Sequence, residues 1–337
     1  MAMISPSDDF LPTATLTALQ RRAGLLQAAR DFFNQQGYWE AQTPILSRDC
    51  CVDVWLDPFA VPLANGEQGY LQTSPEFALK RLICSGADCV FEVARVFRQD
   101  EVGVRHNPEF TMIEWYRRDS DHFLQMDFVE LLIRTLHAWC ETQNWNTPLP
   151  MIPGEFVRFT YEQAFLEFAG LSPRTASTCD LARAAARLTG GLPPGIEEDR
   201  EGLLNLLLAD VIEPAFHRLG AVFLYHFLPS QAALARIHPG PPPVAERFEL
   251  YLNGMELCNG YHELTDAVEL TRRMHAQNEQ RLRLGKPAIR PDSRLLQAMS
   301  AGMPPCSGVA LGFDRLAVWC LGVTSIRDVL SFPFDRA

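Results

Sequence analysis

The chain has 337 residues, a hydrophobic content of 47% and a formal net charge of -11 at pH 7. This length allows a large packed core, whereas the acidic charge is a poor match for a protein that wraps a long polyanion, because Lys and Arg supply that affinity. No stretch approaches the roughly 20 apolar residues that span a bilayer, and the acidic N-terminus differs from a secretory signal, so we expect a cytoplasmic protein without membrane contact. Nine cysteines without a Cys-x-x-Cys pair argue against a disulfide framework and a structural zinc site.

The first predicted element is an amphipathic helix over residues 16–36, where apolar side chains recur at the spacing of one helical face. Further helices are predicted over 123–140 and 266–284, with a helical excursion over 170–220. Strand-like apolar runs occur at 52–56, 70–72, 90–97, 110–116, 221–227, 248–252 and 309–311. Because strands and helices do not alternate as βαβ units, we expect an α+β fold around a largely antiparallel sheet, forming one domain over residues 1–337.

A polar segment follows the predicted strand at 90–97. Arg98 can bind a phosphate in a forked geometry, His106 and Asn107 can form hydrogen bonds, and Phe110 offers a face for stacking on a base. The same residues are also compatible with a β-hairpin that has a salt-bridged surface loop. No Gly-x-x-x-x-Gly-Lys-Ser/Thr loop is present, so ATP would not be bound as in P-loop proteins.

A second polar segment surrounds Asn-Gly at 253–254, a strong signal for a two-residue hairpin turn. This turn would place Glu249 opposite Cys258 and would put Glu249 and Glu256 on one face of the hairpin. Two neighbouring carboxylates repel unless a cation lies between them, and an oxygen-rich site suits Mg²⁺ that bridges phosphates. The alternative is an ordinary solvated face of an antiparallel sheet.

Three ordered segments resemble the motifs of class II aminoacyl-tRNA synthetases, in the form used by the lysyl, aspartyl and asparaginyl subgroup. Residues 37–46 resemble motif 1, a helix and strand at the dimer interface. Residues 97–111, with Phe-Arg and then Arg-His-Asn-Pro-Glu-Phe-Thr, resemble motif 2, and residues 308–316 resemble motif 3. The resemblance implies a class II catalytic core, ATP and Mg²⁺ as cofactors, and a homodimer formed through motif 1.

The resemblance also implies roles for single residues. Arg98 would bind the α-phosphate and, with Arg315, act in catalysis, while Phe110 and Arg315 would lie on the two faces of adenine. Gln99 and Asp100 replace the usual Asn-Glu pair, so a contact from Asp100 has to reach further. The residues implied to bind ATP are Arg98, Gln99, Asp100, His106, Asn107, Phe110, Glu256, Leu257, Gly312 and Arg315, and those implied to bind the metal are Glu249 and Glu256.

Similarity to the lysyl subgroup implies a lysine-like substrate whose side-chain amine lies between Glu76 and Glu263. The full set implied to bind the substrate is Ser74, Pro75, Glu76, Tyr116, Asn259, Glu263 and Ala310. Synthetases commonly have glycine in place of Ala310, and the added methyl group would crowd an α-amino group. A substrate with its amine on the β-carbon would avoid this contact, so (R)-β-lysine is expected to be preferred over lysine.

The acceptor of the activated amino acid is inferred from a missing domain. Motif 1 follows about twenty residues after the first predicted helix begins, so we expect no anticodon-binding domain and no anticodon recognition. Truncated relatives of this kind include bacterial ligases that attach (R)-β-lysine, through an adenylate, to a lysine side chain of elongation factor P. The alternatives are a tRNA-charging or small-molecule ligase and a silent regulatory paralogue. The silent paralogue is disfavoured by four intact residues, Arg98, Glu249, Glu256 and Arg315.

Docking of an acidic acceptor would require a local basic patch on this acidic chain. The candidates for such a patch are Arg21, Arg22, Arg105, Arg117 and Arg118.

Overall fold

The computed structural model describes residues 10–145, 148–291 and 293–337 and contains a nine-stranded sheet in the order β1-β5-β6-β12-β11-β10-β8-β7, with β9 paired to β10. The strands of this sheet are β1 (Trp39–Glu40), β5 (Cys89–Phe97), β6 (Glu109–Arg118), β7 (Val157–Thr160), β8 (Ala221–Phe227), β9 (Ile237–His238), β10 (Val244–Leu252), β11 (Met255–His262) and β12 (Cys306–Gly312). Only the outer pairs β1/β5 and β7/β8 are parallel. The expected α+β fold with a largely antiparallel sheet is therefore confirmed.

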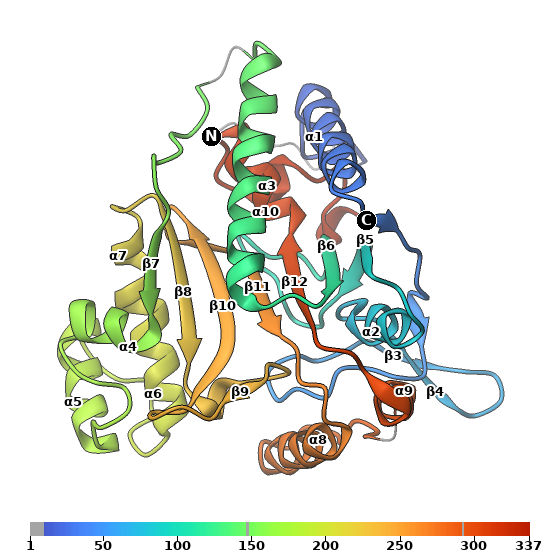
Figure 1. Cartoon of the computed structure of the whole chain (residues 1–337). Helices are drawn as coiled ribbons and strands as arrows, with labels where there is room; N and C mark the ends of the chain where they lie inside the picture. The colour runs from blue at the N-terminus through green and yellow to red at the C-terminus, as the bar shows by residue number, and fades with distance from the viewer. Residues whose placement is uncertain (1–9, 146–147, 292) are drawn as a thin grey trace.

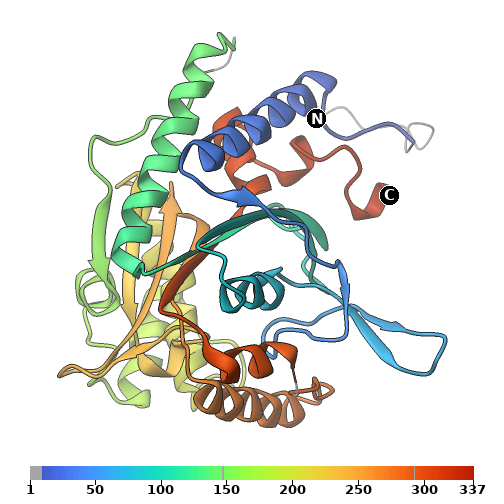
Figure 2. The ribbon, with the colours of Figure 1, turned by 45° about the vertical axis from the view of Figure 1, so that its right-hand side comes forward.

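Helices cover both faces of this sheet (Figure 1). They are α1 (Leu16–Gln35), α2 (Glu76–Cys84), α3 (His122–Thr142), α4 (Tyr161–Ala164), α5 (Thr178–Thr189), α6 (Arg200–Leu207), α7 (Glu213–Phe216), α8 (Ala267–Arg283), α9 (Arg294–Gly302) and α10 (Phe313–Leu321). Helices α1, α3 and α10 pack on one face, and α2 packs on β5 and β6 from the other, with α9 and α8 beyond it (Figure 2). Helices α5, α6 and α7 lie within the helical excursion predicted over 170–220, and α4, just before it, packs on β7 and β8.

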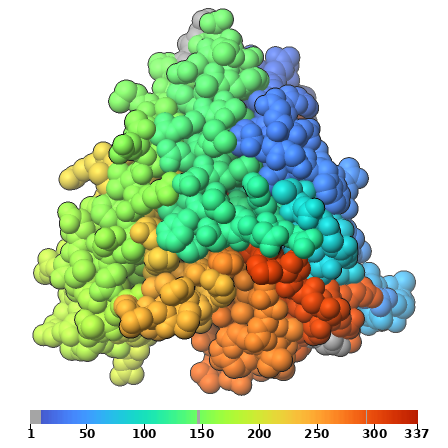
Figure 3. Space-filling view, viewed as in Figure 1, coloured from blue at the N-terminus to red at the C-terminus, as the bar shows by residue number. Residues whose placement is uncertain are grey.

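Helix α1 forms close to the predicted residues because a capping residue begins it and its apolar face packs into the core between α3 and the sheet. Thr15 caps α1 by accepting a hydrogen bond from the backbone of Ala18, and the buried Phe33 stacks on Phe91 of β5 at 4.6 Å between ring centroids. Helix α3 crosses the sheet and forms a band through the middle of the surface seen in Figure 3. Helices α1 and α3 therefore cover one face of the sheet, and the opposite face is left for a cleft.

The predicted strand at 52–56 is wrong. This segment lies outside the small second sheet, whose strands are β2 (Leu46–Ser47), β3 (Ala60–Pro62) and β4 (Gln68–Leu71). The Asp53 carboxylate accepts hydrogen bonds from the backbone of Trp55 and Leu56, which turns the chain. The carbonyl groups of Asp53 and Leu56 accept from Arg281 of α8. Side chains therefore satisfy the backbone groups that a neighbouring strand would have paired.

The predicted hairpin of β10 and β11 forms at Asn253-Gly254, but its register differs from the prediction. Glu249 lies opposite Asn259 instead of Cys258, because the pairing shifts by one residue between Leu250 and Tyr251. The extra residue on β11 is a bulge, which a strict two-residue period cannot anticipate. Glu249 and Glu256 nevertheless both line the same cleft.

Two further expectations concern membranes and cysteines. No helix in the described part of the chain is long and apolar enough to cross a membrane. All nine cysteines are free thiols, and five of them are buried, in agreement with the expectation that no disulfide framework exists.

Candidate active site

A cleft of about 950 Å³ lies on the face of the sheet opposite α3. The pleat separates its residues from the core: Ile113 and Trp115 of β6 point into the core beneath α1 and α3, while Glu114 and Tyr116 line the cleft. Every residue that the sequence predicts for the site lines this cleft except Pro75, Gln99 and Asp100. Pro75 precedes α2, and the other two are exposed on the loop after β5.

Arg98 and Phe110 lie together at one end of the cleft, which we call the arginine end. The Arg98 guanidinium lies 5.1 Å from the centre of the Phe110 ring, in a cation–π contact. Its Nε atom is buried without a hydrogen-bond partner among the described residues, and Nη1 lies 3.5 Å from Glu101 Oε1. Arg98 therefore keeps donors that a bound anion can use.

Arg315 lies near this pair, at the start of α10. Its Nη2 atom is 2.7 Å from His106 Nε2, and its Nη1 donates to the backbone carbonyl of Glu256 at 2.9 Å and lies 3.3 Å from Glu256 Oε2. Burial and the charge of Arg315 lower the pKa of His106, so a neutral His106 can accept the hydrogen bond from Arg315. The arginine end thus joins motif 2, β11 and motif 3.

Asp314, the residue before Arg315, anchors the start of α10. Its carboxylate forms an ion pair with Arg22 of α1 and accepts a hydrogen bond from the backbone of Thr111 at 2.7 Å. Arg22 also donates to the Thr111 hydroxyl at 2.8 Å. This largely buried network binds α1, β6 and α10 together. The sequence had suggested Arg22 as a candidate for an exposed docking patch, but in the structure it is a structural residue.

The side chain of Asn107 is occupied by the protein itself. Its amide nitrogen donates to the carbonyl of Glu109 at 2.6 Å, and its oxygen accepts from the backbone of Phe334 at 2.9 Å. Asn107 therefore shapes the loop between β5 and β6 and ties the C-terminal segment to it.

The carboxylates of Glu249 and Glu256 line the middle of the cleft. Glu249 accepts hydrogen bonds from Arg247 and from the Tyr251 hydroxyl, both at 2.5 Å. Burial and the nearby charge of Glu256 raise the pKa of Glu249, and Arg247 offsets part of that effect. Sequence analysis missed Arg247 and Tyr251, although residues 247, 249 and 251 share one face of β10 and the period of two could have identified them.

The other end of the cleft, which we call the amine end, contains a buried ammonium between two carboxylates. Lys80 Nζ lies 2.5 Å from Glu76 Oε1 and 2.5 Å from Glu263 Oε2. Burial raises the pKa of Glu263 to about 8, although Lys80 opposes the shift. Lys80 was not predicted as a site residue, yet it lies one helical turn after Glu76 in α2, where an i,i+4 ion pair is expected.

Glu114 is a third buried carboxyl group at the amine end and was also missed. The hydroxyl groups of Ser74 and Tyr116 donate to its two oxygens at 2.7 and 2.6 Å. Burial and the charge of Glu76 raise the pKa of Glu114 to about 8, so this group is largely a neutral acid at pH 7. Glu114 lies in the middle of a predicted strand of mostly apolar residues, and no sequence motif marks it as a buried site residue.

Three residues of the neighbouring strands complete the wall of the amine end. Asn259 pairs across the sheet with Ala310, and its Oδ1 atom is buried without a hydrogen-bond partner in the described part of the chain. Gly308 leaves room for the ring of Tyr116, because an added Cβ atom would lie 2.2 Å from Tyr116 Cε1. The wall therefore offers an unused acceptor at Asn259 and a methyl group at Ala310.

Comparison with known proteins identifies the family of this chain. Residues 9–336 match the family described as tRNA synthetases class II (D, K and N), and the chain belongs to this family. It is an enzyme of the ligase class, as its relatives are. Three similar curated proteins are named elongation factor P–(R)-β-lysine ligase.

These relatives match over almost their whole length. The protein from Vibrio cholerae is 40% identical over 98% of this chain and 99% of its own. Those from Salmonella typhi and Yersinia enterocolitica are 40% and 39% identical, each over 99% of this chain and 100% of the relative.

Proposed function

We propose that this enzyme activates (R)-β-lysine, or less readily lysine, with ATP and transfers it to a lysine side chain of elongation factor P. The names of relatives at about 40% identity support the acceptor and the substrate. The observation that carries the proposal is the pairing, within one cleft, of a buried double-carboxylate site with an arginine-lined end. Such a cleft suits a molecule with an ammonium group at one end and a carboxylate that reacts with a phosphate at the other.

The arginine end would bind ATP. Arg98, with its unpaired Nε donor, would hold the α-phosphate, and Phe110 and Arg315 would lie on either face of the adenine. Glu249 and Glu256 provide the oxygen ligands that suit Mg²⁺, and a cation would oppose both burial and the charge of Glu256, which raise the pKa of Glu249. A bound Mg²⁺ would neutralise charge on the phosphates.

The amine end would bind the amino-acid side chain. Glu76 and Glu263 both contact the single ammonium of Lys80, so the ammonium of the substrate would supply a second positive charge and would favour the ionised form of Glu263. The neutral form of Glu114 adds no further charge, and Asn259 offers a further acceptor. The methyl group of Ala310 would disfavour an amine on the α-carbon.

In the proposed reaction, the substrate carboxylate attacks the α-phosphorus of ATP in line and expels pyrophosphate. Arg98 and Arg315 stabilise the charge that develops on the phosphate and hold the reactants in position. The acceptor lysine then attacks the carbonyl of the aminoacyl adenylate as a neutral amine, forms an amide bond and expels AMP. Because lysine is normally protonated at neutral pH, the acceptor amine has to lose a proton before this attack.

We further propose that residues 1–337 act as a single catalytic unit in the cytoplasm and form a homodimer through motif 1. Large apolar side chains of this segment are exposed: Trp39, Ile45 and Leu46 are 49%, 46% and 45% accessible. Substituting Leu46→Asp should shift the protein toward monomer in light-scattering chromatography, whereas Leu284→Asp, at an exposed position after α8, should not.

Transfer of radiolabelled (R)-β-lysine tests the proposal. The reaction would contain ATP and either purified elongation factor P or bulk tRNA as the acceptor. We expect ATP-dependent label on elongation factor P, and none on a variant in which the modified lysine is replaced by arginine. Label on tRNA alone would overturn the proposed acceptor, and no label on either acceptor would overturn the proposed activity.

A further inference from the structure

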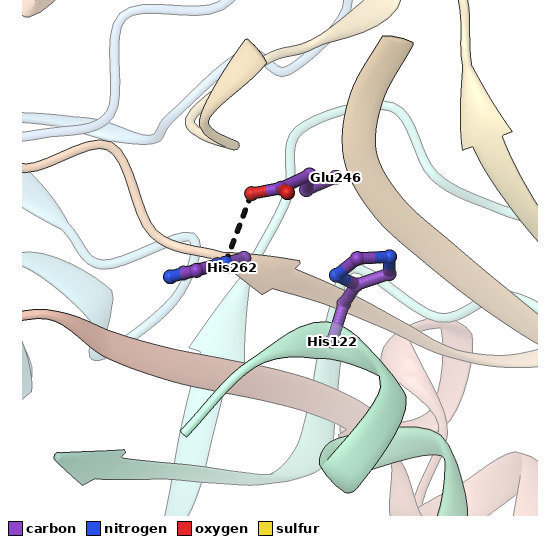
Figure 4. Close-up of side chains that lie close together, drawn as sticks. All are labelled: His122, Glu246 and His262. Atoms are coloured by element: carbon purple, nitrogen blue, oxygen red, sulfur yellow. Dashed lines mark ion pairs between the residues drawn. The ribbon is translucent and has the colours of Figure 1, made fainter. Parts of the chain in front are cut away.

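A second cluster of charged and titratable side chains lies on the opposite face of the sheet from the cleft. His122 begins α3, Glu246 lies in β10 and His262 ends β11. Their neighbours Arg247 and Glu263 point into the cleft, so the alternation of the strands directs Glu246 and His262 toward α3. Figure 4 shows the three side chains converging.

The three side chains have ligand atoms close enough to share one ion. One atom from each of them lies within 4.8 Å of the others. His122 and Glu246 are buried, and His262 is mostly buried. No other group of three His, Cys, Asp or Glu side chains meets this criterion within residues 10–145, 148–291 and 293–337.

His122 has a ring nitrogen that faces the cluster without a hydrogen-bond partner among the described residues. Its Nδ1 atom is buried without such a partner, while its Nε2 lies 3.0 Å from His226 Nε2. An imidazole binds a metal ion through a ring nitrogen that carries no proton. The Nδ1 atom of His122 makes no hydrogen bond within the described residues that would compete with such an ion.

The third ligand is the carboxyl group of Glu246. Its two oxygens accept hydrogen bonds from the guanidinium of Arg236 at 2.6 and 3.0 Å, which favours the carboxylate form. Its Oε2 atom also lies 2.9 Å from His262 Nδ1. The cluster thus combines two imidazoles with one carboxylate.

We propose that His122, Glu246 and His262 form a binding site for a divalent transition metal, best suited to Zn²⁺. Two imidazole nitrogens and a carboxylate oxygen are typical zinc ligands, whereas Mg²⁺ and Ca²⁺ prefer oxygen ligands alone. Tetrahedral zinc needs ligand atoms about 3.3 Å apart, so the side chains have to close in by about 1.5 Å at most. His226 would serve as the outer partner that fixes the His122 ring, a common arrangement around zinc-bound histidine.

Arg236 is the natural competitor of a metal ion at this site. Its guanidinium holds the carboxylate of Glu246, but its side chain is 48% exposed and has room to withdraw into solvent. Binding of a divalent ion would replace the single positive charge of Arg236 beside Glu246 with two. Removing the arginine should therefore strengthen metal binding while all three ligands remain.

Metal binding to the full-length protein, first treated with a chelator, tests this site. Zn²⁺ would be titrated against a chromophoric competitor, and Co²⁺ would be added separately to record the absorption bands of a four-coordinate site. We expect one Zn²⁺ per chain. His122→Ala and Glu246→Gln should each weaken binding by at least about 100-fold and abolish the Co²⁺ bands, because each removes a ligand and not merely an outer partner.

Two further variants keep the test decisive. His275→Ala removes an exposed histidine of α8 and should leave binding unchanged. Arg236→Gln retains the ligands and should bind Zn²⁺ more tightly, which remains measurable even if a ligand variant fails to fold. The proposal is overturned if the wild type binds no Zn²⁺, if binding survives in both ligand variants, as it would at thiols elsewhere, or if Arg236→Gln weakens it.

Discussion

The two ends of the cleft balance their charges in different ways. At the amine end, the side chains of Lys80, Glu76 and Glu263 are 2%, 12% and 1% exposed. At the arginine end, those of Arg98 and Arg315 are 24% and 23% exposed, and their contacts to acidic groups are longer. Buried ion pairs are costly to break, whereas exposed ones contribute little. The amine end is therefore built in advance, and the arginine end is free to exchange its weak pairs for phosphates.

The largest effect should come from the arginine end, through loss of a contact that the reaction needs. We expect Arg98→Ala to lower kcat/KM for ATP-dependent activation by about 100- to 1000-fold, as for other preorganised donors to a developing charge. Arg95→Ala, at an exposed position of the same strand, should leave activation unchanged. Equal losses in both variants would indicate damage to β5 and not to a phosphate contact.

Substitution at the amine end should act mainly on the amino acid. We expect Glu263→Gln to raise KM for the amino acid by about 100-fold, which corresponds to about 3 kcal/mol for a broken buried ion pair. KM for ATP should change little, because Glu263 lies away from Arg98. An increase of similar size in both KM values would contradict the division of the cleft into two ends.

The wall of the amine end should control which amino acid is favoured. We expect Ala310→Gly to shift the ratio of kcat/KM for (R)-β-lysine over lysine by about 10-fold toward lysine, the usual scale for one methyl group in a pocket. Pyrophosphate exchange with each substrate measures this ratio. An unchanged ratio would remove Ala310 from the account of specificity.

The smallest effect concerns stability and pH. The pKa of Glu114 is about 8 in the folded protein and about 4.5 when unperturbed, so the folded state binds the extra proton between these values. This contribution to stability is complete below pH 4.5 and is lost as the pH rises through 8. Glu114→Gln mimics the neutral acid. Its Tm should therefore fall less between pH 5.5 and pH 8 than the Tm of the wild type. A control at the exposed Glu67 should keep the wild-type slope.

Sequence patterns predicted the parts of the fold that local chemistry determines. The Asn253-Gly254 turn, the buried stripe of α1 and most strands formed as expected because turn residues and hydrophobic periods fix them locally. The segment at 52–56 failed because Arg281, more than 200 residues away, satisfies its carbonyl groups. No local pattern contains that information.

The same limit explains which site residues were missed. The resemblance to synthetases predicted roles for Glu76 and Glu263, but Glu114 becomes a candidate only once Ser74 and Tyr116 are seen to donate to it. His122, Glu246 and His262 come from distant positions without a shared motif. Cysteine spacing argues only against a thiolate zinc site, so it could not reveal a cluster of histidine and glutamate.

The most direct test of the central claim is ATP–pyrophosphate exchange with amino acids that have the terminal amine and with one that lacks it. The account predicts exchange with (R)-β-lysine and lysine, and a rate at least about 100-fold lower with norleucine, whose chain matches lysine but has no ammonium for Glu76 and Glu263. Exchange with norleucine at a rate close to that of lysine would contradict it.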